Sequence, residues 1–139
     1  MSEIAPFLYL GNRNAGNMEF VRKHGITCIV NVLNIQEWEN VEKVVSIDVE
    51  DSPNAELWRH FDEVADVIHE QRCKGGKTLI FCLAGISRSA SLAIAYFIKH
   101  EKLSYPQALA RVKEKRDIIN PNEGFIQQLQ SFHQRLQNQ

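Results

Sequence analysis

Residues 78–98 constrain the fold of this chain more than any other stretch. The run 78–81 is apolar and partly β-branched, which favours a buried strand, and Cys82 follows it directly. The segment 90–98 is almost wholly apolar, which is typical of a helix buried on most sides. Only a compact loop separates the two. We therefore expect a strand, a tight turn and a buried helix, around which the remaining elements must pack.

The turn between this strand and this helix is a candidate site for a doubly charged oxyanion. Loop N–H groups and the positive end of the helix dipole converge between Cys82 and Arg88. The same field favours a thiolate at Cys82. Arg88 is alternatively an ordinary helix-start arginine in a surface salt bridge, but the apolar helix after it leaves no surface for that role. The predicted anion-binding loop consists of Leu83, Ala84, Gly85, Ile86, Ser87 and Arg88.

Length and composition indicate one ordinary globular domain over residues 1–139. The chain is 44% hydrophobic and 24% charged, and it is too short for two comfortable domains. A net charge of −1 gives no overall field for nucleic acid or membranes, and there is no transmembrane-length run or signal pattern. Three cysteines without a C-x-x-C pair fit a reducing cytoplasmic or nuclear setting and argue against structural zinc.

Hydrophobic periodicity predicts alternating strands and helices along the rest of the chain. We expect strands at 7–10, 26–32, 44–49 and 78–81, helices at 14–24, 57–68 and 90–98, a helix starting at a capping box over 104–107, and a last helix capped by Asn122. Such alternation predicts an α/β fold with a central, mostly parallel, twisted sheet of about four to five strands flanked by helices. The anion-binding loop follows the carboxyl end of a strand, where ligands bind in such sheets.

The loop carries the mark of a known family. Cys82, five further residues, Arg88 and Ser89 match the C-x5-R-S signature of cysteine-dependent protein phosphatases, and the chain resembles the small dual-specificity phosphatases. ITCIVNV, IDVEDSP and INPNEGFIQQL resemble segments of that family in the same order. The resemblance covers essentially the whole chain. It implies a protein tyrosine phosphatase-like fold and hydrolysis of phosphotyrosine and phosphoserine or phosphothreonine, without metal or other cofactor, by an atypical enzyme consisting of the catalytic domain alone.

The resemblance also implies a role for each of four side chains. Cys82 is the expected nucleophile that forms a phosphocysteine, and Arg88 is expected to bind the phosphate and stabilise the transition state. Asp51 matches the general acid, and Ser89 supplies a hydroxyl that helps the sulfur depart. From residue type alone, the favoured interpretation of Asp51 is a residue of an Asp-Ser-Pro turn that caps its own backbone, and the two interpretations of Ser89, the functional one and a serine filling the first helical turn, are equally good. Glu50 is an adjacent rival acid, but residue-by-residue matching to the family favours Asp51.

Phe81 is the one clear departure from the family pattern, because relatives carry a histidine immediately before the nucleophile. Phenylalanine cannot donate a hydrogen bond and adds apolar bulk, so we expect a weaker thiolate, reduced turnover and an optimum shifted to higher pH. The change gives some weight to an alternative, a weakly active or inactive pseudophosphatase that binds phosphorylated partners. Retention of Cys82, Arg88 and Asp51 favours the enzyme.

Phosphorylated proteins are the expected substrates. A phosphoinositide or the 5′ end of an RNA would favour a more basic rim, whereas Leu83, Ala84 and Ile86 are uncharged. Arg116 aligns with a basic position near the pocket in relatives and is a candidate for binding a second phosphate. The preferred interpretation of Arg116 is a solvated arginine at a helix end. Neither a nucleic acid nor a membrane is an expected partner, and the sequence predicts no oligomeric state.

Overall fold

The computed structural model describes residues 1–33, 38 and 41–139. Its strands are β1 (Ser2–Ala5), β2 (Leu8–Gly11), β3 (Cys28–Asn31), β4 (Lys43–Ser46) and β5 (Thr78–Phe81). Within the described residues they form one five-stranded sheet in the order β1-β2-β5-β3-β4. Only the β1–β2 pair is antiparallel, and β2, β5, β3 and β4 run parallel to one another. The predicted α/β fold with a mostly parallel central sheet is confirmed.

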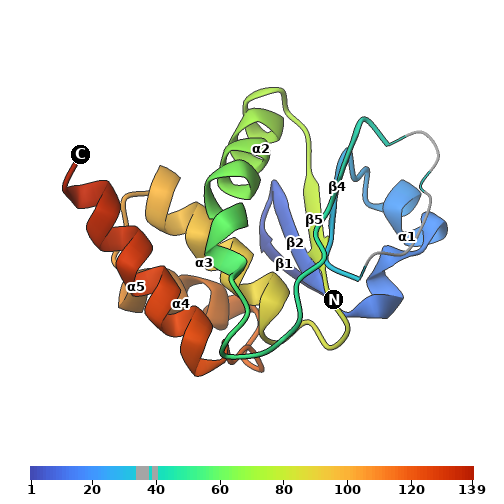
Figure 1. Ribbon diagram of the computed structural model, residues 1–139. Coiled ribbons are helices and arrows are strands. Elements are labelled where there is room, and N and C mark those ends of the chain that lie inside the picture. The colour runs from blue at the N-terminus through green and yellow to red at the C-terminus, as the bar shows by residue number, and fades with distance from the viewer. Residues whose placement is uncertain (34–37, 39–40) are drawn as a thin grey trace.

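Helices cover both faces of the sheet. They are α1 (Met18–Lys23), α2 (Phe61–Cys73), α3 (Arg88–His100), α4 (Tyr105–Lys115) and α5 (Glu123–Gln137), with short 3-10 turns η1 (Arg13–Gly16) and η2 (Leu57–His60). In Figure 1, α1 lies on one side of the sheet and the other four helices lie on the opposite side. Across the described part of the chain, no helix combines the length and the hydrophobicity needed to span a membrane.

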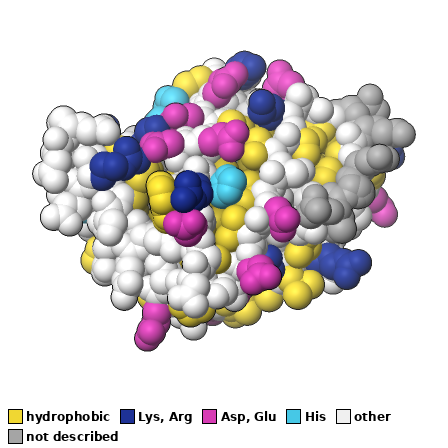
Figure 2. All heavy atoms as spheres, in the orientation of Figure 1, with side chains coloured by type: hydrophobic (Ala, Val, Ile, Leu, Met, Phe, Trp, Pro, Cys, Tyr) yellow, Lys and Arg dark blue, Asp and Glu magenta, His cyan; other side chains and the backbone are white. Residues whose placement is uncertain are grey.

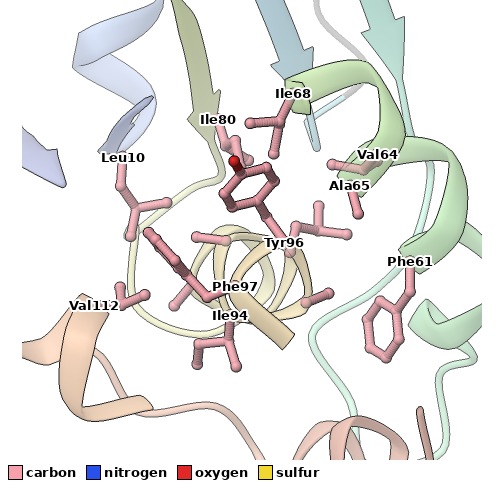
Figure 3. Packing of buried hydrophobic residues seen from close by; sticks show 14 of the residues in the cluster. Leu10, Phe61, Val64, Ala65, Ile68, Ile80, Ile94, Tyr96, Phe97 and Val112 are labelled. Carbon is pink, nitrogen blue, oxygen red and sulfur yellow. The ribbon is translucent and has the colours of Figure 1, made fainter. Parts of the chain in front are cut away.

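Helix α3 forms the centre of the larger hydrophobic core. Every residue from Ser89 to Ile98 is buried, as the apolar sequence of this helix predicts. Figure 3 shows Tyr96 directed towards Ile80 of the sheet and Phe97 directed towards Leu10. The Tyr96 hydroxyl accepts a hydrogen bond from Arg72 Nη1 at 2.8 Å, so this buried polar group is satisfied. The strand–loop–helix unit is therefore fixed by the core on its helical side.

Several elements differ from the sequence-based expectations. The helix predicted over 57–68 begins as the 3-10 turn η2, and α2 then continues to Cys73. Strand β1 was not predicted; it extends the edge of the sheet by pairing with β2. The predicted helix over 14–24 is interrupted at Asn17, whose side chain accepts a hydrogen bond from Phe20 N and starts α1 afresh. Strand β4 ends at Ser46 instead of residue 49, because its partner strand β3 ends at the paired position, Asn31.

Both predicted helix starts near the C-terminus are confirmed. Ser104 and Gln107 form a capping box at the beginning of α4. The Asn122 side chain accepts a hydrogen bond from Phe125 N at 2.9 Å and caps α5. This second cap matters for the site, because Asn122 also contacts the loop before α3.

Acidic and basic side chains are interspersed on the face shown in Figure 2. Ion pairs between helices include Lys99–Asp66 at 2.8 Å and Arg135–Asp62 at 2.7 Å. Solvent-accessible pairs of this kind each contribute little to stability. Each pair brings two opposite charges together, so that they neutralise one another locally.

Candidate active site

The residues that follow β5 bring a thiol, a hydroxyl and a backbone amide together. Cys82 is only 2% exposed. Its Sγ lies 3.1 Å from Ser89 Oγ and accepts a hydrogen bond from Gly85 N at 3.2 Å. Thus Cys82 at the end of the strand, Gly85 within the loop and Ser89 in the first turn of α3 converge on one sulfur atom.

Four successive carbonyl groups of the loop are hydrogen-bonded to donors outside it. The donors are Arg13 N to Leu83 O at 3.2 Å, Arg116 Nη2 to Ala84 O at 3.5 Å, Arg116 Nε to Gly85 O at 2.8 Å, and Asn120 N to Ile86 O at 2.9 Å. In a trans peptide the C=O and the following N–H point in opposite directions. The peptide between Ala84 and Gly85 shows the result: its oxygen faces Arg116 and its N–H faces Cys82 Sγ. The loop amides are therefore turned inward, where an anion can accept them.

Gly85 is required at its position for two reasons. Its φ of 68° lies in the left-handed region, which favours glycine. In addition, a Cβ atom at this position would lie 2.7 Å from Gly11 O and 2.6 Å from Arg116 Nη2. The loop thus turns tightly at Gly85 and packs closely against β2 and Arg116.

The start of α3 adds a further set of donors. Ser87 is the N-cap residue, but its side chain does not cap the helix. Its Oγ instead accepts a hydrogen bond from Asn122 N at 3.0 Å. Because no side-chain cap from Ser87 occupies the first turn, the positive end of the helix dipole is open towards the loop.

The Arg88 guanidinium contacts the segments that follow β3 and β4. Its Nη1 donates to Val49 O at 3.1 Å and to Val32 O at 3.4 Å. Its Nε is buried and has no hydrogen-bond partner in the described part of the structure. Buried polar groups in proteins are almost always paired, so this N–H is a donor available to a bound anion. The surface salt bridge considered for Arg88 is not what these contacts show.

Asp51 lies in the connection between β4 and η2 and is exposed to solvent, as is Glu50. Its Oδ1 accepts a hydrogen bond from Asn122 Nδ2 at 2.9 Å. Since Asn122 N also donates to Ser87 Oγ, one residue contacts both the Asp51 carboxylate and the anion-binding loop. Asn122 therefore links Asp51 to the loop that follows Cys82, although 30 residues separate Asp51 from Cys82 in the chain.

Arg116 is not the solvated helix-end residue that the sequence favoured. It is 8% exposed and uses its guanidinium to bind loop carbonyls and Ser2 Oγ, the latter at 3.1 Å. Burial lowers the pKa of the Arg116 guanidinium, and the charge of Cys82 acts in the opposite direction. The sequence predicts Asn122 only as a helix cap and carries no signal for its hydrogen bond to Asp51.

Phe81 lies on the other side of the sheet from the core around α3. Its side chain is fully buried, and its ring centroid lies 5.6 Å from that of Trp38 in an edge-on arrangement. It belongs to a second, smaller hydrophobic cluster that includes Tyr9 and Val21. Because successive side chains of a strand point to opposite faces, Phe81 faces this cluster while Cys82 belongs to the core on the α3 side.

Comparisons with known proteins agree in one assignment. A family model described as "Dual specificity phosphatase, catalytic domain" matches residues 8–135. Dual specificity protein phosphatase 14 from Homo sapiens is 39% identical over 140 residues, covering 98% of this chain and 70% of that protein. A probable dual specificity protein phosphatase from Dictyostelium discoideum is 39% identical over 134 residues, but the chain spans only 34% of its length. The crystal structure of human DUSP28 superposes with a TM-score of 0.90 at 34% identity, covering 98% of this chain and 94% of that one.

Proposed function

The chain belongs to the dual specificity phosphatase family, and from this premise we propose that it is a protein phosphatase that acts on phosphotyrosine and on phosphoserine or phosphothreonine through a phosphocysteine intermediate. One observation carries the proposal: the Gly85 N–H points at Cys82 Sγ inside a loop in which four successive carbonyls are hydrogen-bonded to donors outside the loop. Such a cradle binds a phosphate dianion next to a thiolate and stabilises both charges.

In the first step, the Cys82 thiolate attacks phosphorus and the bond from phosphorus to the leaving oxygen breaks. Loop amides and the Arg88 guanidinium bind the equatorial oxygens, and the free Nε–H of Arg88 supports this role. Asp51 donates its proton to the leaving hydroxyl oxygen. The products of this step are the dephosphorylated side chain, a phosphocysteine and an Asp51 carboxylate.

In the second step, water attacks the phosphocysteine and the bond from sulfur to phosphorus breaks. The Asp51 carboxylate accepts a proton from the attacking water, and inorganic phosphate leaves. The sulfur departs as a thiolate, which the Ser89 hydroxyl at 3.1 Å stabilises by donating a hydrogen bond. Each residue thereby returns to its starting protonation state.

Protein substrates are favoured over polyanionic ones by the character of the loop surface. Leu83 is 57% exposed and Ala84 is also exposed, and neither carries charge. A phosphoinositide or RNA end would require further cations at this rim to bind its additional phosphates. Arg116 is the candidate for such a contact, but its buried guanidinium donates hydrogen bonds to the loop carbonyls of Gly85 and Ala84.

The test is hydrolysis of p-nitrophenyl phosphate across pH, followed by phosphotyrosine and phosphothreonine peptides. Cys82→Ser is compared with Cys73→Ser, because Cys73 is a free and exposed cysteine outside the loop. We expect turnover that EDTA does not affect, that Cys82→Ser abolishes and that Cys73→Ser retains. Equal activity of the wild type and Cys82→Ser would overturn the proposed mechanism. Binding of phosphopeptides without turnover would instead identify a pseudophosphatase.

A further inference from the structure

The departure at Phe81 raises the question of what supports the nucleophile on this loop. We propose that Arg116 is a positioning residue for Cys82: it fixes the loop amides from behind through Ala84 O and Gly85 O and supplies a positive charge beside the loop. This inference rests on the proposed function, because it concerns the same thiolate and the same loop. It assigns to α4 and β1 a part in the site that lies outside the C-x5-R-S signature.

The first support is the pattern of hydrogen bonds around the loop. Of the donors to its four carbonyls, Arg116 alone is charged, and it alone serves two of them. Hydrogen bonds from a charged donor are roughly twice as strong as neutral ones. The peptide that Arg116 holds by Ala84 O is the one whose N–H donates to Cys82 Sγ. Arg116 therefore acts on the nucleophile through a single peptide group.

The second support is the charge itself. Arg116 is buried, and among the described residues no carboxylate forms an ion pair with it. A buried cation is costly unless a negative charge lies nearby. The loop that it contacts holds the Cys82 sulfur and is shaped for a phosphate dianion. A thiolate or a bound anion in the loop thus supplies the charge that Arg116 lacks.

The third support is how the guanidinium is fixed. Arg116 Nη1 donates to Ser2 Oγ at 3.1 Å, so strand β1 holds the outer end of the planar group. Gly85 allows the inner end to approach, because a Cβ there would lie 2.6 Å from Nη2. A lysine has no planar fork and cannot satisfy two carbonyls and a hydroxyl in this geometry. Phe81, by contrast, is buried in a hydrophobic cluster on the opposite face and offers no hydrogen bond.

The inference is tested with Arg116→Met, Arg116→Lys and a matched control, Lys115→Met, which removes the same charge from an adjacent exposed position. Two readouts are taken in a Cys73→Ser background: kcat/KM for p-nitrophenyl phosphate and the pH dependence of alkylation by iodoacetate, mapped to Cys82 by mass spectrometry. Cys28 does not interfere, because burial raises its pKa to about 11. Thermal unfolding of each variant is measured in parallel.

We expect Arg116→Met to lower kcat/KM by about 100-fold and to move the midpoint of Cys82 alkylation to higher pH by about one unit. Arg116→Lys should keep the midpoint near that of the wild type, because the charge remains, while kcat/KM falls because the fork is lost. Lys115→Met should match the wild type in both readouts. Arg116→Met with an unchanged alkylation midpoint, or equal midpoint shifts in the Met and Lys variants, would overturn the inference.

Two further comparisons keep the result decisive. If Arg116→Met does not fold, Arg116→Lys and Ser2→Ala still test the fork, and wild-type kcat/KM in both would overturn the positioning role. Alkylation needs no turnover, so it also separates the two proposals. Absence of Cys82-dependent turnover in the wild type would contradict the proposed function. The shift in the pH midpoint of Cys82 alkylation would still test the role of Arg116, because alkylation does not require turnover.

Discussion

The two halves of the site are held in very different ways. The loop after β5 has exposed side chains at Leu83 and Ala84, but four of its carbonyls are fixed by donors from η1, from Arg116 at the end of α4 and from the segment after α4. Asp51 is exposed, and within the described residues its carboxylate accepts a hydrogen bond from Asn122. The loop that binds the anion is therefore preorganised before a ligand arrives, whereas the position of the proton donor Asp51 depends on few contacts. Damage to the first half should impair both binding and chemistry, and damage to the second should impair the rate alone.

Arg88→Lys tests the anion-binding loop and should have the largest effect on kcat/KM. Lysine cannot reproduce a planar fork that binds Val49 O and leaves Nε for an anion. We expect kcat/KM to fall by about 1000-fold and inhibition by inorganic phosphate to weaken in parallel. Steady-state kinetics with phosphate as a competitive inhibitor measure both. Unchanged phosphate inhibition would show that Arg88 does not bind the anion in the free enzyme.

Asp51→Asn tests the other half and should separate rate from binding. We expect kcat to fall by about 100-fold on phenyl phosphate, whose leaving group needs a proton, and less on p-nitrophenyl phosphate. Inhibition by inorganic phosphate should stay at the wild-type level. Glu50→Gln is the matched control at the neighbouring exposed carboxylate. If Glu50→Gln shows the larger loss, Glu50 is the general acid.

Asn122→Asp tests the hydrogen bond that Asn122 donates to Asp51. Aspartate caps a helix about as well as asparagine, so the stability of α5 should be retained. The new carboxylate, however, would face the Asp51 oxygen that Asn122 now contacts at 2.9 Å. We expect kcat to fall on the order of 10-fold through displacement of Asp51. In a double-mutant cycle with Asp51→Asn the loss should disappear; independent, additive losses would contradict this role of Asn122.

Phe81→His should have the smallest effect on catalysis. A histidine before the nucleophile is expected to favour the thiolate, so turnover should rise a few-fold and the optimum should move to lower pH. The same change places a polar ring in the cluster around Trp38, which should lower the free energy of unfolding by about 2 kcal/mol. The pH–rate profile and urea denaturation measure the two effects. An identical optimum in both proteins would show that Phe81 is neutral for the thiolate.

The parts of the structure that the sequence predicted well are those set by local pattern. The apolar run before Cys82, the apolar helix after Arg88 and the caps at Ser104 and Asn122 each depend on residues close together in the chain. Strand β1 was not predicted, because Ser2–Ala5 is short and its extended conformation is defined by pairing with β2. The end of β4 was predicted too late because it depends on where its partner strand stops.

The candidate site divides in the same manner. Cys82, Ser89 and the loop lie within eight consecutive positions, so their approach follows from one turn. The second contact of Asn122 joins positions 71 residues apart, and that of Arg116 with Gly85 joins positions 31 apart. An arginine or asparagine at a helix end has no local signal for such partners. Only the tertiary structure shows that these residues complete the site.

The complete burial of α3 links the anion-binding loop to the cooperativity of the whole domain. Amide protons exchange with solvent through local opening where contacts are few and only through global unfolding at the centre of a core. Residues 89–98 of α3 are buried without exception, so the helix cannot open alone. The loop at its N-terminus should therefore keep its shape up to the temperature at which the protein unfolds, while the segment around Asp51 exchanges much earlier. On heating, proton transfer by Asp51 should therefore be lost at a lower temperature than anion binding by the loop.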